Sequence, residues 1–210
     1  FLSPFIMIVF FKEDKPLKFI SEVKRNKKLS PLSLEYFDRR SLDFLKKDFP
    51  NIPKVSQGAI YTEQEEGKNT LEEWAKLTEG YPVIDIWIGK DERSYQKLVD
   101  FRHRLPENIN NYFKRIKSSK LATDIAVPED SFGELVDFYK MLRKKTQIET
   151  VLFGHIGENH LHFNLFPKDE MEKKEALKIC ESAVRKGIEM KGTVSAEHGI
   201  GKLKHKYLEI

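Results

Sequence analysis

The order of apolar patterns in the N-terminal part of the chain constrains the fold more than any other feature of this sequence. A continuous apolar run at Phe5–Phe11 predicts a buried strand, and apolar residues at helical spacing follow within Lys15–Lys28. The next patterns are strands at Leu32–Phe37 and Gly58–Thr62, a helix at Asn69–Thr78 and a strand at Val83–Ile88. This βαββαβ order predicts a ferredoxin-like antiparallel sheet with its helices on one face.

A second αβ portion extends this unit. A long helical pattern covers Asp91–Lys117, and we expect it to be interrupted or kinked at Pro106 because proline lacks the amide hydrogen. The remaining patterns predict strands at Leu121–Val127, Ile148–Phe153 and His160–Phe166, and helices at Asp130–Lys144 and Asp169–Met190. The predicted fold class is therefore α+β.

Composition indicates a globular protein and excludes several functions. Of the 210 residues 40% are hydrophobic, which is enough for a core, and the formal net charge of +4 is too small to imply a nucleic-acid partner. The apolar opening is broken by Pro4 and is shorter than the roughly 20 residues of a membrane helix, so we expect no transmembrane segment. A single cysteine, Cys180, fits a reducing compartment, so we expect a cytoplasmic location and leave peripheral association with the inner membrane open.

Both ends of the sequence suggest a piece of a larger protein. The chain begins with Phe1 rather than methionine, almost directly in a strand, and it stops at Ile210 shortly after a glycine-containing loop. We expect residues 1–210 to form one domain of that protein.

Histidines concentrate near the C-terminal end, where five of the six lie. Within the motif Gly154–Asn164, strand alternation places His160, His162 and Asn164 on one face and the intervening apolar residues on the other. A single histidine is more often structural, but histidines that cluster on one face favour a divalent metal site, because neutral imidazole nitrogen binds zinc.

A second motif, Gly192–Lys202, follows the last predicted helix. It carries an acid and an imidazole side by side, Glu197 and His198, in a loop whose glycines allow the backbone to approach a ligand closely. By itself such a pair is more often a solvated turn, so its significance comes from its pairing with the histidine motif.

Together the two motifs resemble the C-terminal domain of the FAD-linked oxidases related to D-lactate dehydrogenase, glycolate oxidase and D-2-hydroxyglutarate dehydrogenase. The family pattern Gly-His-x-Gly-Asp-Gly-Asn-x-His, followed by Glu-His-Gly-x-Gly, is similar to Gly154–His162 and Glu197–Gly201. The similarity extends to Leu34–Arg40, Phe101–Glu107 and Thr123–Pro128, and so covers nearly the whole chain.

This resemblance implies a metal site and a catalytic base. His155, His162 and Glu197 would bind a divalent metal, zinc or manganese, and His198 would be the catalytic base.

Three positions of the histidine motif depart from the family pattern. Glu158, Asn159 and His160 stand where the family has aspartate, glycine and asparagine. Asparagine tolerates the left-handed backbone region that glycine favours. His160 adds either a further metal ligand or a substrate contact.

Substrate-binding residues also follow from the resemblance. Arg102 matches an arginine that pairs with the substrate carboxylate, a role that suits its planar guanidinium. Asn164 would add a polar contact. Some relatives have a lysine at the position of Ala122, and here Lys120 is the candidate to replace it.

The implied reaction is the flavin-dependent oxidation of a small D-2-hydroxy acid to the 2-keto acid, by a dehydrogenase or oxidase. FAD would be bound mainly by a domain upstream of Phe1, so we expect this chain alone neither to retain FAD firmly nor to turn over substrate. An electron acceptor or an iron-sulfur module is a plausible partner. The identity of the hydroxy acid and the oligomeric state, a homodimer included, stay open.

Two hypotheses from other functional classes remain. A metal-dependent hydrolase would use the same His/His/Glu cluster to activate water, and it would cleave generic esters with zinc and without flavin. A non-catalytic ferredoxin-like module would bind a small ligand without metal and would tolerate His198→Ala.

Overall fold

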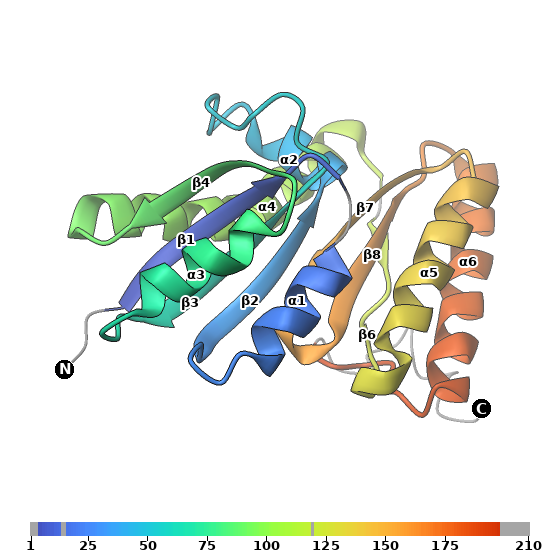
Figure 1. Cartoon of the computed structure of the whole chain (residues 1–210). Coiled ribbons are helices and arrows are strands. Elements are labelled where there is room, and N and C mark those ends of the chain that lie inside the picture. Colours follow the sequence, from blue (N-terminus) through green and yellow to red (C-terminus); the bar gives the residue numbers. More distant parts are fainter. Residues whose placement is uncertain (1–3, 14–15, 119, 198–210) are drawn as a thin grey trace. The chain divides into compact units, whose positions relative to one another are not determined.

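The computed structural model describes residues 4–13, 16–118 and 120–197. Within these ranges the chain forms two compact units (Figure 1). One holds the residues up to Ile109 together with His155–Gly157, and the other holds Asn110–Gly154 and the residues from Glu158 on.

The first unit contains the predicted ferredoxin-like sheet. Its elements are β1 (Pro4–Phe11), α1 (Pro16–Arg25), β2 (Pro31–Asp38), α2 (Arg39–Leu45), β3 (Gly58–Glu65), α3 (Thr70–Glu79), β4 (Val83–Gly89) and the N-terminal part of α4 (Glu92–Ile116). The strands lie in the order β4-β1-β3-β2, and every neighbouring pair is antiparallel. This strand order confirms the prediction from the βαββαβ pattern.

Strand β1 is apolar without interruption because both faces of this sheet are covered. Successive residues of a strand point to opposite faces. Phe11 packs against Phe19 of α1, with ring centroids 5.1 Å apart, whereas Phe10 packs against Phe101 of α4 at 6.3 Å. Phe19 also contacts Trp74 of α3, so α1 and α3 share one face, as expected for the split unit, and α4 covers the other.

The second unit is built around strand β8. Its elements are the C-terminal part of α4, β5 (Leu121–Ala122), β6 (Ile125–Ala126), α5 (Glu129–Lys145), β7 (Glu149–Gly154), the 3-10 helix η1 (Ile156–Glu158, of which only Glu158 belongs here), β8 (His160–Phe166) and α6 (Glu170–Glu189). Strand β8 pairs antiparallel with β7 on one side and with β5 and β6 on the other. Helices α5 and α6 lie side by side (Figure 1), and α6 also contacts β5 and β6.

The predicted strand Leu121–Val127 is two short strands rather than one. Ala122 pairs with Asn164 and Ile125 with Leu161, so both pieces keep the same register against β8. Between them, the side chain of Thr123 accepts a hydrogen bond from the amide of Phe163 at 3.1 Å. Side-chain bonds at this interruption therefore replace part of the regular strand ladder.

Two helical features also differ from the sequence prediction. Helix α2 was not predicted, although Asp38 caps it by accepting a hydrogen bond from the amide of Ser41 at 2.7 Å. Helix α4 continues through Pro106, so the helix is not interrupted there, and a kink at this proline stays a prediction. Within the described ranges, no helix has the length and apolar character that crossing a bilayer requires.

Candidate metal and substrate site

The hairpin between β7 and β8 carries the histidine motif, and two unusual backbone conformations shape its turn. Gly154 has φ 142°, and a Cβ there would lie 3.1 Å from the carbonyl oxygen of His160 and from Cδ2 of His162. Asn159 has φ 56°, in the left-handed region that asparagine adopts more readily than most residues. This agrees with the expectation that asparagine can replace the family's glycine.

Strand alternation places the rings of His160 and His162 together, as the sequence predicts. Their centroids lie 4.5 Å apart, and the residues are only 2% and 7% exposed. Asn164 lies two residues further on and is also buried, but its amide Nδ2 donates to the backbone carbonyls of His162 at 3.0 Å and Val151 at 3.3 Å. The polar face of β8 is therefore a buried site, and Asn164 supports its backbone.

The segment that follows α6 is held against the strand region around β6. Thr193 and Ala126 exchange two backbone hydrogen bonds, of 2.8 and 3.1 Å, and the amide of Ala196 donates to the carbonyl of Asp124 at 3.2 Å. A Cβ on Gly192 would lie 2.4 Å from the carbonyl oxygen of Ala126, so only glycine allows this approach. These contacts position Glu197.

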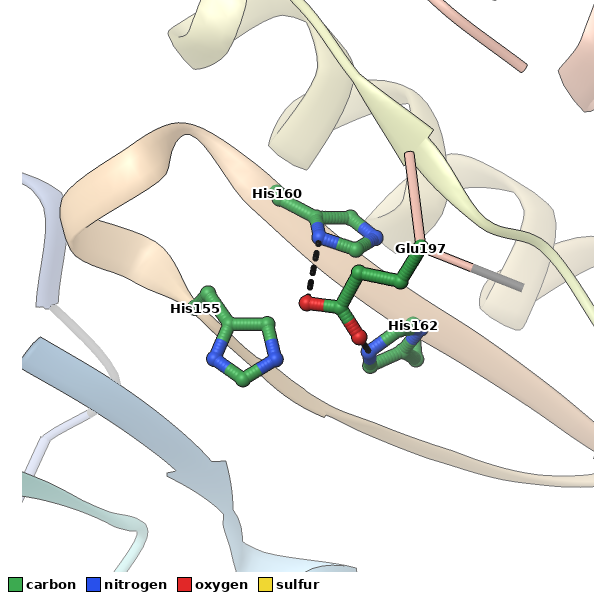
Figure 2. A group of neighbouring side chains, drawn as sticks. All are labelled: His155, His160, His162 and Glu197. Atoms are coloured by element: carbon green, nitrogen blue, oxygen red, sulfur yellow. Dashed lines mark ion pairs between the residues drawn. The ribbon is translucent and has the colours of Figure 1, made fainter. Parts of the chain in front are cut away.

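Glu197 completes a group of potential metal ligands. One carboxylate oxygen lies 3.5 Å from Nδ1 of His160 and the other 4.0 Å from Nε2 of His162, and Figure 2 shows the carboxylate between the two rings. His155 is the first residue of the β7–β8 turn, and potential ligand atoms of all four residues lie within 4.8 Å of one another. We call these four residues the ligand group.

The donors of the ligand group suit a divalent transition metal. Three imidazoles and one carboxylate are ligands that zinc and related ions accept, and two of the imidazoles are buried. The sequence prediction named His155, His162 and Glu197 as ligands and His160 as an extra one, and the structure brings all four together.

A buried carboxylate contacts His155. Glu35 of β2 is 4% exposed, and Nδ1 of His155 lies 2.9 Å from its Oε1 and 2.8 Å from its Oε2. A carboxylate only accepts hydrogen bonds, so Nδ1 donates, and in the neutral ring the lone pair is then on Nε2. Such a contact is typical of histidines that bind metal through the other nitrogen.

The same carboxylate holds Arg102 of α4. Nη2 of Arg102 lies 2.6 Å from Glu35 Oε1, and the guanidinium lies over the ring of Tyr61, 5.9 Å from its centroid. Arg102, the predicted partner of the substrate carboxylate, is thus bound to an acid of the protein. The contact with Glu35 uses only part of the five N–H donors of a guanidinium.

Of the two remaining predicted residues, Lys120 is not brought to the ligand group. Lys120 is exposed and directly precedes β5, whose Leu121 pairs with Leu165. Lys120 therefore lies opposite the last residue of β8. That position is four residues, or about 13 Å along the strand, beyond His162. His198, the predicted base, lies outside the described residues.

Comparison with known protein families tests the resemblance that the two motifs indicate. Residues 3–210 match the family described as FAD linked oxidases, C-terminal domain. The chain belongs to this family. Membership agrees with the resemblance read from the two motifs, and the match covers both units of the FAD linked oxidase domain.

Relatives of this FAD linked oxidase domain are hydroxy-acid enzymes by name. Glycolate oxidase subunit GlcD of Bacillus subtilis strain 168 is 26% identical over 87% of this chain and 40% of its own length. D-2-hydroxyglutarate dehydrogenase of Stutzerimonas stutzeri strain A1501 is 29% identical over 70% of the chain and 32% of its own length. D-lactate dehydrogenase of Archaeoglobus fulgidus is 22% identical over 97% of the chain and 44% of its own length. The chain therefore spans less than half the length of these relatives.

Solved structures agree on the fold of the FAD linked oxidase domain. A 4-ethylphenol oxidase from Gulosibacter chungangensis, in complex with isoeugenol, superposes with a TM-score of 0.57 at 10% identity. The match covers 91% of this chain and 45% of that one. At such low identity, this likeness is evidence for the fold alone.

Sequence reasoning gave no role to two carboxylates of this FAD linked oxidase domain, Glu35 and Asp124. Both fall in segments that resemble the family, and both are nearly fully buried in the structure. The available signal was an acidic residue inside an otherwise apolar strand pattern. A buried charge of this kind requires partners, and here the partners include histidines of the ligand group.

Proposed function

We propose that this chain is the substrate- and metal-binding part of a flavin-dependent dehydrogenase or oxidase that converts a small D-2-hydroxy acid to the 2-keto acid. The observation that carries the proposal is the ligand group, whose donor atoms lie within 4.8 Å of one another. Family membership and the names of the relatives support flavin-dependent oxidation over the hydrolase and the non-catalytic module.

In this proposal His155, His162 and Glu197 hold a divalent ion, zinc or manganese. A bound ion would supply the Lewis acidity that lowers the pKa of the substrate hydroxyl. FAD, bound mainly outside this chain, would supply the hydride acceptor.

The chain's own residues orient the substrate and remove its proton. Arg102 pairs through its remaining N–H groups with the substrate carboxylate, and Glu35 holds its guanidinium in place. His198 follows Glu197 directly in the sequence and takes the hydroxyl proton as general base. The hydroxyl oxygen loses this proton, and the carbon that bears the hydroxyl loses a hydride to the flavin. Together the two losses turn the alcohol into the carbonyl group of the 2-keto acid.

Several predicted partners and sites stay predictions. They are the substrate contacts of Lys120 and Asn164, a cytoplasmic location, a homodimer, and an electron acceptor or iron-sulfur module. The expectation that residues 1–210 are a single domain also stays a prediction.

The test uses the protein encoded by the reading frame that contains this sequence, purified with its flavin. We expect D-lactate, glycolate or D-2-hydroxyglutarate to drive the reduction of an artificial dye. His198→Ala should slow turnover by about 10²–10⁴-fold, because general-base catalysis is worth that much. Asp169→Asn, which changes a helix cap on α6, should retain the wild-type rate.

Two results would contradict the proposal. One is the absence of dye reduction with any 2-hydroxy acid in the flavin-loaded protein. The other is wild-type turnover in the His198→Ala variant.

A further inference from the structure

Asp124 and His160 form a buried pair within the ligand group. Nε2 of His160 lies 3.0 Å from Oδ1 of Asp124, and the two side chains are 2% and 1% exposed. The main-chain amide of Glu197 lies 3.4 Å from both carboxylate oxygens of Asp124. Asp124 thus contacts two members of the ligand group at once.

The register of the strands explains why these side chains meet. Ile125 pairs with Leu161 and Ala126 with His160, so continuing the register places Asp124 opposite His162. His160 lies two residues from His162 on the same face of β8, which makes it the diagonal neighbour of Asp124 and within reach of its side chain. The contact between Asp124 and His160 therefore follows from the pairing of β6 with β8 and does not depend on the turn between β7 and β8.

The contact with Asp124 determines which nitrogen of His160 can bind a metal. A carboxylate accepts hydrogen bonds only, so Nε2 carries the hydrogen, and in the neutral ring Nδ1 carries the lone pair. That nitrogen points toward Glu197, the acidic member of the ligand group (Figure 2). Carboxylate, imidazole and ion in this order form a common arrangement at metal sites, in which the carboxylate orients the ring and raises its basicity.

The distance between His160 and Glu197 suits two ligands of one ion better than a direct hydrogen bond. Nδ1 of His160 lies 3.5 Å from Oε1 of Glu197. A charge-assisted N–H to carboxylate bond is about 2.7–2.9 Å long. Two ligands at about 2.0–2.2 Å from a tetrahedral ion are instead about 3.3–3.5 Å apart.

We propose that His160 is a fourth protein ligand of the metal through Nδ1, and that Asp124 is the positioning residue that orients it. This inference rests on the metal site of the proposed function and extends it, because the resembling family has asparagine where this chain has His160. With four protein ligands, tetrahedral zinc would have no open position. Substrate binding at the ion would then require a fifth ligand position, which zinc can provide by expanding its coordination.

The test measures metal binding by the chain without reference to turnover. Metal-free protein is titrated calorimetrically with Zn²⁺ and with Mn²⁺. We expect Asp124→Asn to weaken binding about 10–100-fold, the usual effect of losing a residue that orients a metal ligand, and His160→Asn to weaken it at least as much, because it removes the ligand itself. The double variant should lose less affinity than the two single effects combined, because Asp124 acts largely through His160. Asp169→Asn, the same change at an exposed helix cap, should bind like the wild type.

A second measurement keeps the proposal testable if Asp124→Asn does not fold. Nitrogen NMR of the metal-free wild type should show His160 protonated on Nε2 and bare on Nδ1, with the Nδ1 signal shifting when zinc is added. A His160 ring protonated on Nδ1 would overturn the inference.

The outcomes separate this inference from the proposed function. If His160→Asn binds metal as tightly as the wild type while His162→Asn binds none, the ion is present without His160, and only the inference fails. If the wild type binds neither metal, the inference and the proposed metal site fail together.

Discussion

At the scale of single residues, two buried carboxylates set the orientation of the ligand group. Glu35 bonds Nδ1 of His155, and Asp124 bonds Nε2 of His160, so in the neutral rings opposite nitrogens remain for a metal. A buried carboxylate without such partners would be strongly destabilising. Each pair therefore satisfies the acid and fixes the imidazole at the same time.

Removing the charge of Glu35 tests this role. We expect Glu35→Gln to weaken zinc binding about 10-fold or more, because the amide anchors the His155 ring and Arg102 less firmly. Glu63→Gln on the neighbouring strand, whose carboxylate bonds Tyr95, removes the same charge and should leave zinc binding unchanged. Equal zinc affinity in the two variants, measured by calorimetry, would refute the role of Glu35.

At the scale of elements, the sequence indicates most strands and helices because their apolar patterns are continuous. The phenylalanine-rich β1 and the alternating β8 are examples. Helix α2 was not predicted because it is short and because its main signal in the sequence is a single residue, the N-cap Asp38. Sequence motifs also placed the histidines in one group, but they could not show that Glu35 and Asp124 lie behind the rings. Those contacts depend on strand register and on residues far apart in the chain.

Packing of the 192–197 segment on β6 gives a prediction at this scale. Gly192→Ala places a methyl group against the backbone of Ala126, so we expect a loss of stability of about 1–3 kcal/mol and weaker zinc binding through displacement of Glu197. The matched control is Gly133→Ala on α5, where a Cβ meets nothing within 4 Å. It should raise stability by about 0.5–1 kcal/mol, because alanine favours a helix over glycine. Chemical denaturation measures both, and a neutral Gly192→Ala would contradict the packing argument.

At the scale of the whole molecule, several tyrosines make stability sensitive to alkaline pH. Burial raises the pKa values of Tyr61, Tyr81 and Tyr139 above the usual value of 10.0, and the hydrogen bond to Glu63 raises the pKa of Tyr95 to about 12. A tyrosine whose pKa is higher in the folded state stabilises the fold fully at pH values below its pKa in the unfolded chain. This stabilisation is lost as the pH rises through its pKa in the folded state.

We therefore expect thermal stability to fall between about pH 10 and pH 12, because these hydroxyls lose their protons in the unfolded chain while the folded chain still holds them. The unfolding temperature, followed by circular dichroism, measures this fall. Tyr95→Phe removes one of the groups and should make the fall shallower. An unfolding temperature that stays constant over that range would contradict the assignment.

The most direct test of the central claim is the position of a bound metal in crystals of this chain soaked with zinc. Anomalous diffraction at the zinc edge should give one strong peak, about 2.0–2.2 Å from a nitrogen of His155, a nitrogen of His162 and an oxygen of Glu197. A saturating zinc soak that leaves this position empty, or that places the peak elsewhere, would contradict the account.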